Sequence, residues 1–374
     1  MRVLHINSGN ELGGGMVHIL TLLKNLQLNI DVTLGIFENG ELLERAQKSG
    51  IPTHHFHQKS RFDVTVLREI KKFVGSNNID IVHTHGARAN FYVSLMKKKL
   101  GCPWIVTVHS NPLDDFMHMK ILGKLYSQLN IHAIRSADHV IAISGRIKDV
   151  LVELGVNPDK IDVILNGIDF DAVPQKRYTR KDFHLEEDDF VIMMAARLEV
   201  VKNHAMALEA VAMVLRNYPK VRLLLVGDGS RKEELKEMVK KMGMDDAVRF
   251  LGWRNDVAEL LPICDLSLLT SISESFPLVL LESARAKKPF ISTDVGDVEK
   301  LAGDGEFSKV VPVNDVHSLT EQILEMIRMK EKGELEKLGE RLRSFAKEHY
   351  SDKIFCNKVM EVYRSLVPSI RREM

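Results

Sequence analysis

The sequence predicts an α/β protein with two parallel sheets, each covered by helices. Short apolar runs rich in β-branched residues alternate with helix-length amphipathic stretches along the whole chain, and this alternation is typical of parallel strands joined by crossover helices. A chain of 374 residues is longer than one typical domain and accommodates two domains of about 150 to 200 residues. Hydrophobic residues make up 45% and charged residues 28%, as in an ordinary folded globular protein.

The first domain is predicted over residues 1–172. Its strands are expected at 3–7, 31–37, 80–84, 104–109, 139–143 and 161–165. A polar stretch at 166–189 follows, and we interpret it as the linker because it has little apolar periodicity. Within it, the D-x-D sequence Asp169-Phe170-Asp171 is interpreted as a turn and not as a metal site.

The second domain is predicted over residues 173–352. Its strands are expected at 190–197, 221–227, 247–252, 265–270 and 289–293, with helices at 203–218, 230–242 and 277–287. The C-terminal helix, over 353–374, is expected to pack back on the first domain. Ligands of open parallel sheets bind at the carboxyl ends of the strands, so we expect the active site in the cleft between the domains.

Charge, cysteine content and hydropathy exclude several functions and locations. The 52 basic and 51 acidic residues give a net charge of +1, so no overall field attracts nucleic acid, and no nucleic-acid partner is expected. Cys102, Cys264 and Cys356 form no closely spaced pair, which indicates a reducing compartment. No apolar run approaches the roughly 18 residues of a membrane span, and the first residues do not read as a signal peptide. We predict a cytoplasmic protein.

The segment S-E-S-F-P-L-V-L-L-E, residues 273–282, has the features of a phosphate site. It follows a predicted strand, and Pro277 suits the first turn of a helix because its missing N–H would be unpaired there. The backbone amides of Phe276, Leu278 and Val279 would then face an anion such as a diphosphate at the helix N-terminus.

Two carboxylates flank this predicted helix start. Glu282, about one turn into the helix, can accept hydrogen bonds from the hydroxyls of a ribose, while Glu274 on the loop faces the group beyond the phosphates. Their spacing suits a nucleotide sugar. The alternative is that both are surface carboxylates near a helix start, where acidic residues are common.

Two cations provide the context that favours the functional interpretation. Arg197 ends a predicted buried strand, and Lys202 follows five residues later, before a predicted helix. Cations at the carboxyl end of a strand can neutralise a leaving diphosphate in the transition state. A charged turn with solvated side chains is the alternative for such a pair on its own.

The pattern R-L-x-x-x-K followed by E-x7-E resembles the retaining GT-B glycosyltransferases of family 4. HINSGNELGGGMVHIL, DIVHTHG, WIVTVHS, LLLVGDG, FLGWRND and ISTDVGDVEKL are also similar to segments of that family. The resemblance spans the chain and implies two Rossmann-like domains. The first domain would bind the acceptor and the second a nucleoside-diphosphate sugar. The expected reaction moves a hexose-type sugar to an acceptor hydroxyl, in the synthesis of a surface glycan, a glycolipid or a small glycoside.

The resemblance also implies roles for individual residues. Arg197 and Lys202 would grip the donor diphosphate, Glu274 the sugar hydroxyls and Glu282 the ribose. His109 would face the transferred sugar, so His109, Arg197, Lys202 and Glu274 are the expected catalytic residues. The donor-binding residues expected besides them are Gly14, Gly15, Arg254, Phe276, Pro277, Leu278, Val279 and Glu282.

The chain departs from the usual pattern of the family at four glycine positions. These positions carry Ala196, Asn203, Ser275 and Asp297. No cofactor is expected besides the sugar nucleotide, and we expect transfer without a metal.

Glycines and histidines allow two other interpretations. Gly13 to Gly15 stand in G-x-x-x-G-G-G and not in the G-x-G-x-x-G of nicotinamide enzymes; a plain turn is the simple alternative. His83 with His85, and the H-H-F-H segment at 54–57, raise the question of a metal. No carboxylate or cysteine stands at ligand spacing beside them, so ordinary hydrogen bonding is the preferred interpretation.

Two basic helical stretches, 61–75 and 90–101, combine an apolar face with cations. A solvated face on a packed helix explains them, but a lipid acceptor would favour peripheral contact with a membrane. The acceptor, possible lipid linkage, donor base and oligomeric state stay open. The alternatives to a transferase are a catalytically idle nucleotide-sugar binder and another GT-B enzyme such as a sugar-nucleotide epimerase.

Overall fold

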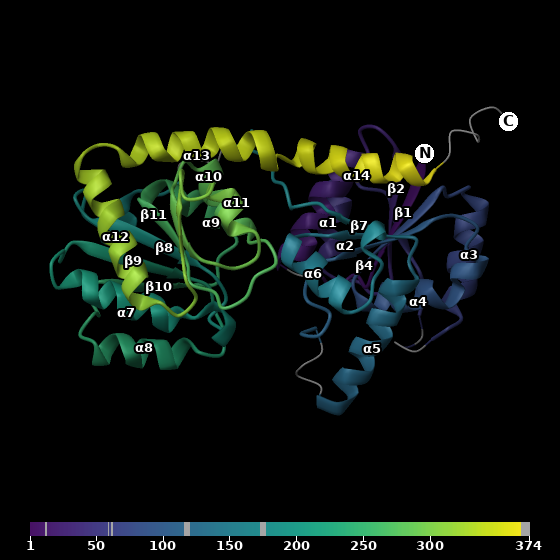
Figure 1. Cartoon of the computed structure of the whole chain (residues 1–374), viewed down its shortest axis with the longest axis horizontal. Helices are drawn as coiled ribbons and strands as arrows, with labels where there is room; N and C mark the ends of the chain where they lie inside the picture. Colours follow the sequence, from purple (N-terminus) through teal and green to yellow (C-terminus); the bar gives the residue numbers. More distant parts are fainter. Residues whose placement is uncertain (12, 59, 61–62, 116–119, 173–176, 368–374) are drawn as a thin grey trace. The chain divides into compact units, whose positions relative to one another are not determined.

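A computed structural model describes the chain except residues 12, 59, 61–62, 116–119, 173–176 and 368–374 (Figure 1). The chain folds into two compact units. One contains Met1–Asp169 and Asp352–Met374, and the other contains Phe170–Ser351. All strand pairings in both units are parallel, which confirms the predicted α/β class.

The first unit is built on a seven-stranded sheet with the order β3-β2-β1-β4-β5-β6-β7. The strands are β1 (Arg2–Asn7), β2 (Asp31–Ile36), β3 (Thr53–His55), β4 (Ile81–His85), β5 (Trp104–Val108), β6 (His139–Ala142) and β7 (Ile161–Val163). The helices are α1 (Gly13–Leu26), α2 (Glu41–Lys48), α3 (Val66–Ser76), α4 (Ala87–Met96), α5 (Lys120–Ser136), α6 (Gly145–Glu153) and α14 (Asp352–Leu366).

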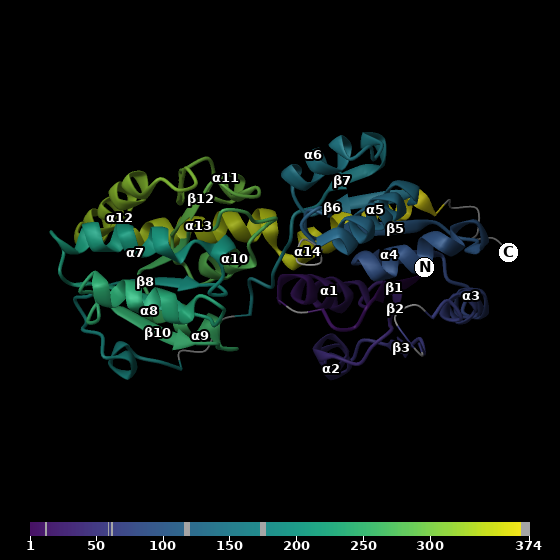
Figure 2. The same ribbon diagram turned by 90° about the horizontal axis from the view of Figure 1, so that it is seen from below.

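Apolar side chains alternate between the two faces of this sheet, as the period of a strand requires. Val3 packs with side chains of α1, α2 and α14. Its neighbour Leu4 packs on the opposite face with side chains of α3, α4, α5 and α6. Helix α14 lies against α1 (Figures 1 and 2) and buries Phe355 and Tyr363 in the core of this unit.

The second unit is built on a six-stranded sheet with the order β10-β9-β8-β11-β12-β13. The strands are β8 (Phe190–Ala195), β9 (Val221–Val226), β10 (Val248–Gly252), β11 (Leu266–Leu269), β12 (Phe290–Thr293) and β13 (Lys309–Val311). The helices are α7 (His204–Leu215), α8 (Lys232–Lys241), α9 (Val257–Leu260), α10 (Leu278–Arg285), α11 (Val298–Leu301), α12 (Val316–Glu331) and α13 (Leu335–Tyr350). One face packs against α7, α8 and α12, and α13 packs against α10.

The structure differs from the sequence-based expectation at two short strands and in the linker. Strands β3 and β13 were not predicted because each is only three residues long and lies at a sheet edge, where an apolar run gives little signal. The linker prediction for 166–189 was too long. Tyr178, Phe183 and Leu185 pack in the apolar cluster of the second unit, so the described part of this stretch is largely folded onto that unit.

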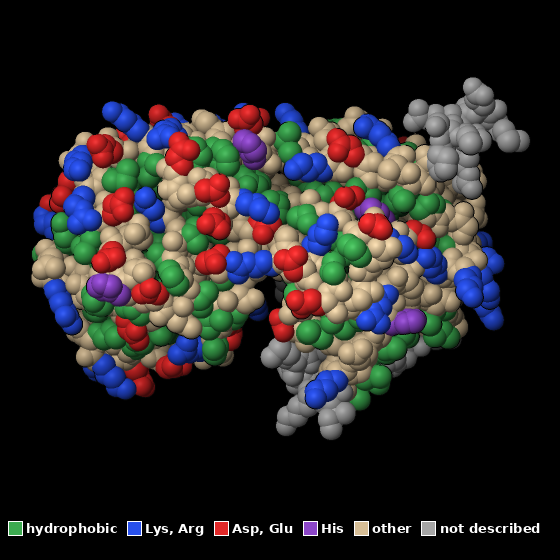
Figure 3. Space-filling view, in the orientation of Figure 1, with side chains coloured by type: hydrophobic (Ala, Val, Ile, Leu, Met, Phe, Trp, Pro, Cys, Tyr) green, Lys and Arg blue, Asp and Glu red, His purple; other side chains and the backbone are tan. Residues whose placement is uncertain are grey.

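The described helices include none that is both long and apolar enough to cross a membrane. On the face shown in Figure 3, basic and acidic side chains are interspersed. This mixture fits the near-zero net charge and provides no extended basic surface on that face.

Candidate functional site

In the second unit, Arg197 lies in the loop that connects β8 to α7, just beyond the carboxyl end of β8. Its side chain is exposed. The loop is held by the segment that follows β9, because the amide of Leu198 donates to the carbonyl of Asp228 at 3.0 Å. The Ser230 hydroxyl also donates to Oε2 of Glu199 at 2.7 Å. The anchored loop therefore presents an exposed guanidinium at the sheet edge.

Asn203 closes the same loop in a left-handed conformation, with φ of 49° and ψ of 49°. Glycine adopts this conformation without strain and asparagine tolerates it better than most residues, so asparagine can replace the glycine of the family pattern. Asp297 has φ of −109°, where any side chain is allowed. Ala196 and Ser275 also avoid positive φ. The four departures from the family pattern are therefore compatible with the loop backbones.

Lys202 and Glu274 lie together although they are 72 positions apart in the sequence. The Lys202 ammonium donates to Oε1 of Glu274, and the Ser271 hydroxyl donates to the same oxygen at 2.6 Å. The side chains of Lys202 and Glu274 are only 18% and 14% exposed, so solvent screens this ion pair less than a surface pair. Two of the residues predicted from separate motifs therefore belong to one cluster.

The helix start that was predicted beside Glu274 exists, but it begins one residue later than expected. Pro277 precedes α10 as its N-terminal cap and is not in the first turn, because its ψ of 109° is extended. Its carbonyl accepts the amide of Leu280 at 3.2 Å. Leu278 and Val279 are the first two helical residues, whose amides have no partner within the helix. Phe276 is buried, and its ring lies 5.7 Å from that of Tyr350.

Glu282 lies one turn into α10, in a half-buried position. Burial raises the pKa of this carboxyl, and the nearby Arg285 guanidinium opposes the shift. A buried carboxylate costs free energy in the folded state. A ligand whose hydroxyls donate hydrogen bonds to the Glu282 carboxylate would offset this cost.

Arg254, which the sequence predicts to bind the donor, is hydrogen-bonded to side chains of the second unit. Its Nε donates to Asp256 at 2.8 Å, and its terminal nitrogen donates to Asp256 at 2.7 Å and to the Tyr178 hydroxyl at 2.8 Å. The guanidinium also lies over the rings of Tyr178 and Phe183. The preceding Trp253 is 69% exposed, and no sequence motif had singled it out.

In the first unit, His109 lines a cavity of about 440 Å³ at the carboxyl ends of β4 and β5. The lining combines polar side chains with apolar ones such as Val108 and Ile134. The polar lining residues include Ser8, Asn10, Glu11, His85, Arg88, Asn90, His109, Ser110, Asp115 and Asn130. Burial raises the pKa of both Glu11 and Asp115. Sequence reasoning missed these two carboxylates, because Glu11 occupies a variable position of G-x-x-x-G-G-G and Asp115 stands in no motif.

The glycines Gly14 and Gly15 lie in the first turn of α1. A side chain at position 15 would contact the carboxylate of Glu11. Gly15 therefore lets the helix start approach one of the acidic side chains that line the cavity.

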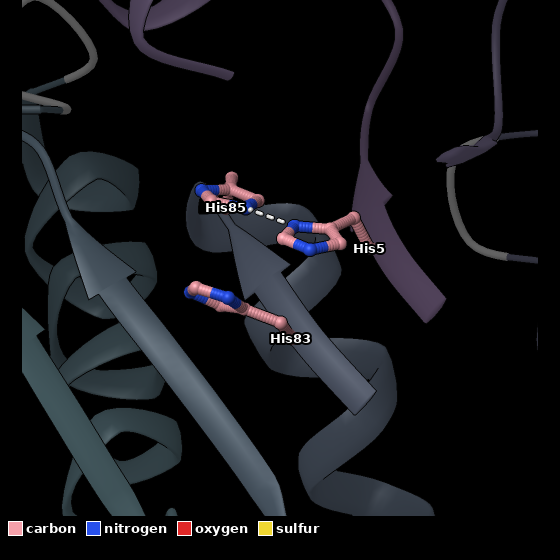
Figure 4. Close-up of side chains that lie close together, drawn as sticks. All are labelled: His5, His83 and His85. Carbon is pink, nitrogen blue, oxygen red and sulfur yellow. Dashed lines mark hydrogen bonds between the residues drawn. The ribbon is translucent and has the colours of Figure 1, made fainter. Parts of the chain in front are cut away.

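His83 and His85 belong to a larger histidine cluster in the core of the first unit. Figure 4 shows them beside His5, with a hydrogen bond of 3.0 Å between His5 Nδ1 and His85 Nε2. The ring nitrogens of this trio lie within 4.8 Å of one another, as do those of the trio His18, His85 and His109.

The H-H-F-H segment contacts a carboxylate that the sequence spacing did not reveal. Nε2 of His54 lies 3.5 Å from Glu69 and Nδ1 of His57 lies 3.8 Å from it. Glu69 is on α3, and folding brings it to β3. His55 instead contacts the carbonyl of Phe37 at 3.1 Å.

Comparison with known families agrees with this arrangement of two units. The model of the family described as Glycosyltransferase Family 4 matches residues 12–172, and that of Glycosyl transferases group 1 matches residues 175–349. Together the two matches cover most of the chain. The chain is a family 4 glycosyltransferase.

Curated relatives of this family 4 glycosyltransferase include a galactosyltransferase and a synthase from two bacteria. An Escherichia coli protein named UDP-Gal:alpha-D-GlcNAc-diphosphoundecaprenol alpha-1,3-galactosyltransferase is 28% identical over 265 residues, which are 68% of each chain. The N-acetyl-alpha-D-glucosaminyl L-malate synthase of Bacillus anthracis is 27% identical over 320 residues, which are 83% of this chain and 80% of the relative.

Solved structures show the same GT-B fold. Anabaena HepE in complex with UDP superposes on this glycosyltransferase with a TM-score of 0.83 at 18% identity, over 98% of this chain and 100% of HepE. HepE in complex with UDP-glucose gives the same TM-score at 19% identity.

The buried carboxyl of Glu282 predicts a gain in stability when it is neutralised. The pKa of Glu282 is raised in the folded state. Its contribution to the stability of the wild type is therefore fully present below the unfolded pKa and is lost as pH rises through the folded pKa. We expect Glu282→Gln to raise the free energy of unfolding by about 1 kcal/mol at pH 8, or Tm by roughly 2–4 °C, with a smaller gain at pH 5.

Calorimetry of both proteins between pH 5 and 8 measures this difference. Glu237→Gln is the matched control, because Glu237 is an exposed carboxylate on α8. Its replacement should leave Tm nearly unchanged. A Tm for Glu282→Gln at or below that of the wild type at pH 8 would contradict the account.

Proposed function

We propose that this glycosyltransferase moves a hexose-type sugar from a nucleoside diphosphate to an acceptor hydroxyl with retention of anomeric configuration. The observation that carries the proposal is the cluster beyond β8 and β11. There, Lys202 and Glu274 lie in contact, and Arg197 and the first amides of α10 belong to the adjoining segments. Cations and helix amides are the groups that bind a diphosphate.

In this proposal the cluster stabilises the leaving diphosphate. Arg197 and Lys202 neutralise charge that develops on the phosphates in the transition state, and the amides of Leu278 and Val279 add the favourable end of a helix dipole. These groups provide the neutralisation that a metal provides in other transferases, so we propose transfer without a metal. Glu282 binds the ribose and Glu274 the sugar hydroxyls.

The Lys202–Glu274 pair adds a feature to this mechanism. Without donor, Glu274 neutralises Lys202. Bound phosphate oxygens compete for the same ammonium, and Glu274 can then turn its acceptor oxygens to sugar hydroxyls. The pair thus keeps a part-buried cation satisfied until the donor arrives, since an unpaired charge in this position is costly.

Retention is supported by the family resemblance. Glu274 and Glu282 are assigned to donor binding and not to a covalent intermediate, which favours front-face attack over double displacement. We propose attack from the same face as the leaving group, with a donor phosphate oxygen taking the acceptor proton. The configuration of the product anomer, measured by NMR, tests this. An inverted anomer would exclude it.

UDP is the proposed nucleotide of the donor. Support comes from the name of the Escherichia coli relative, which contains UDP-Gal, and from the UDP bound to HepE. In this chain, we propose that Arg254, which the Asp256 carboxylate orients, and backbone groups beside Trp253 contact the base. A GDP-sugar is the alternative donor. Turnover measured with a panel of UDP- and GDP-sugars decides between the two nucleotides.

We also propose a lipid-linked acceptor and contact of the first unit with an anionic membrane surface. Exposed Leu122, Leu125 and Leu129 lie on α5, which packs beside α4. Their spacing of three, four and seven residues places them on one face of the helix. Residues 87–99 and 120–136 contain no Asp or Glu but carry several cations, including the exposed Lys98 and Lys124. Apolar residues flanked by cations are typical of membrane-surface helices.

Replacement of Lys202 by alanine should lower turnover about a hundredfold, or about 3 kcal/mol, because one cation at the leaving diphosphate is lost. The measurement is release of UDP from a panel of UDP-hexoses in the presence of a cell extract that supplies the acceptor. Lys241→Ala is the control, because Lys241 is exposed on α8. Unchanged turnover in Lys202→Ala would contradict the assignment.

The same assay separates the alternative functions. A transferase releases nucleoside diphosphate only when an acceptor is present. An epimerase converts the donor without any acceptor. A catalytically idle binder is stabilised by a UDP-sugar in a thermal shift, by about 2.7 kcal/mol at 100 times Kd, but releases nothing.

Replacement of Leu125 by glutamate should reduce binding to vesicles that contain anionic phospholipid about tenfold or more. The change removes an apolar contact and places a negative charge against the lipid. Co-sedimentation measures this, and Leu28→Glu is the control because Leu28, 77% exposed, follows α1 and lies outside α5. Equal vesicle binding by Leu125→Glu and the wild type would exclude α5 as the contact.

A further inference from the structure

The histidine cluster lies on the face of the first sheet that α1 and α14 cover. Near the start of β1, β4 and β5, this face carries the apolar side chains of Val3, Ile81 and Ile105. Side chains alternate with a period of two, so the same face carries His5, His83, His85, Thr107 and His109 further along. The register of the strands places His5 beside His83 and His85 beside Thr107.

A continuous chain of hydrogen bonds links these side chains. His109 Nε2 lies 3.2 Å from His85 Nδ1, and His85 Nε2 lies 3.0 Å from His5 Nδ1. His5 Nε2 lies 3.1 Å from the hydroxyl of Tyr363. This chain of hydrogen bonds begins at the cavity, which His109 and His85 line. Three hydrogen bonds connect His109 to Tyr363 on α14.

The chain continues from α14 back to the sheet. The Tyr363 hydroxyl lies 2.6 Å from Nδ1 of His83, and Nε2 of His83 lies 2.7 Å from the hydroxyl of Thr107. Both nitrogens of His5, His83 and His85 are thereby used. In this arrangement, hydrogen bonds to neighbouring side chains occupy the nitrogens of the trio that had raised the question of a metal.

The imidazoles of this chain are neutral near neutral pH. Burial is the main cause that lowers the pKa of His5 to about 3 and those of His83, His85 and His109 well below 6.5. A neutral imidazole has one donor nitrogen and one acceptor nitrogen. Each imidazole therefore passes the direction of the bonds on. The Tyr363 hydroxyl does the same, because accepting both bonds would leave its own buried proton without an acceptor. The direction at one end of the hydrogen-bond chain thus fixes the tautomer at the other.

Thr107 sets that direction. Its side chain is 2% exposed, and among the described residues its hydroxyl is bonded to His83 Nε2. If Thr107 accepted from His83, its own hydroxyl proton would have no acceptor among the described residues, and an unpaired buried donor is costly. Thr107 therefore donates to His83, His83 donates to Tyr363, and Tyr363 donates to His5.

We propose that this chain, from Thr107 through Tyr363 to His85, holds His109 in the tautomer that carries its proton on Nδ1. His85 Nδ1–H donates to His109 Nε2, so the lone pair of His109 is used inside the protein. The remaining N–H of His109 is a hydrogen-bond donor available to a hydroxyl or ring oxygen of a sugar in the cavity. Tyr363, Thr107 and the intervening histidines are positioning residues that act through His109.

The proposal gives the C-terminal helix a role in the site as well as in the core. Tyr363 is 358 positions from His5 in the sequence. Its hydroxyl connects the hydrogen bonds of His5, His85 and His109 to those of His83 and Thr107. Burial raises its pKa well above 10, so the hydroxyl keeps the proton that it must donate. The consequence for transfer rests on the proposed function, whereas the tautomer itself does not.

NMR of protein labelled with ¹⁵N-histidine tests the tautomer without substrate, because ring nitrogens with and without a proton have different shifts and couplings. His109→Gln assigns the signal. We expect His109 of the wild type to be protonated on Nδ1 at pH 7. Protonation on Nε2 would overturn the proposal, whatever the activity of the protein.

Tyr363→Phe tests whether the chain imposes this tautomer. It removes one hydroxyl from the middle of the chain, so both directions become open to His5, His85 and His109, and a mixture of tautomers should appear. Tyr92→Phe is the matched control, because Tyr92 is a buried tyrosine of the same unit outside the chain. A single unchanged tautomer in Tyr363→Phe would exclude the coupling.

Thr107→Val and Thr107→Ser provide a second test that does not depend on α14. Valine removes the terminal donor and should give the same mixture, while serine keeps the hydroxyl and should restore the wild-type spectrum. If transfer activity is found, kcat should fall about twofold for an equal mixture of tautomers, with KM for the donor unchanged. Normal spectra for Thr107→Val would overturn the direction assigned to the chain.

Discussion

The parallel direction of the strands in each sheet is the constraint on which the rest of the structure depends. Parallel strands all end at the same edge, and the loops that follow them are brought together there. In the second unit this edge carries Arg197 after β8 and Glu274 after β11, and in the first unit it carries His85 at the end of β4 and His109 after β5. The strands also carry much of the buried apolar surface of both cores, so the core is formed by the same strands that present the polar groups.

Burying titratable groups near these edges costs folding free energy. The carboxyl of Glu282 has a raised pKa, and the buried histidines have lowered pKa values, because burial disfavours the charged form of each. The two units offset this cost in different ways. In the second unit, charges are paired with one another, as Lys202 is with Glu274. In the first unit, the imidazoles stay neutral and satisfy one another through hydrogen bonds.

Sequence patterns predicted the class, the long strands and the family, because buried parallel strands are continuous apolar runs and the donor motif has fixed spacing. They could not predict that Lys202 contacts Glu274 or that Tyr363 completes the histidine chain, since both contacts join residues that only the tertiary fold brings together. The sequence likewise did not show that Asp256, two residues after Arg254, accepts hydrogen bonds from its guanidinium. The donor contact expected of Arg254 stays a prediction.

Isothermal titration calorimetry with UDP and uridine tests the central claim, that a diphosphate binds at the edge of the second sheet through Arg197, Lys202 and the start of α10. UDP should bind the wild type far more tightly than uridine does. The double variant Arg197→Ala with Lys202→Ala should lose most of this preference and keep its weak affinity for uridine. UDP binding of undiminished affinity in the double variant would contradict the account.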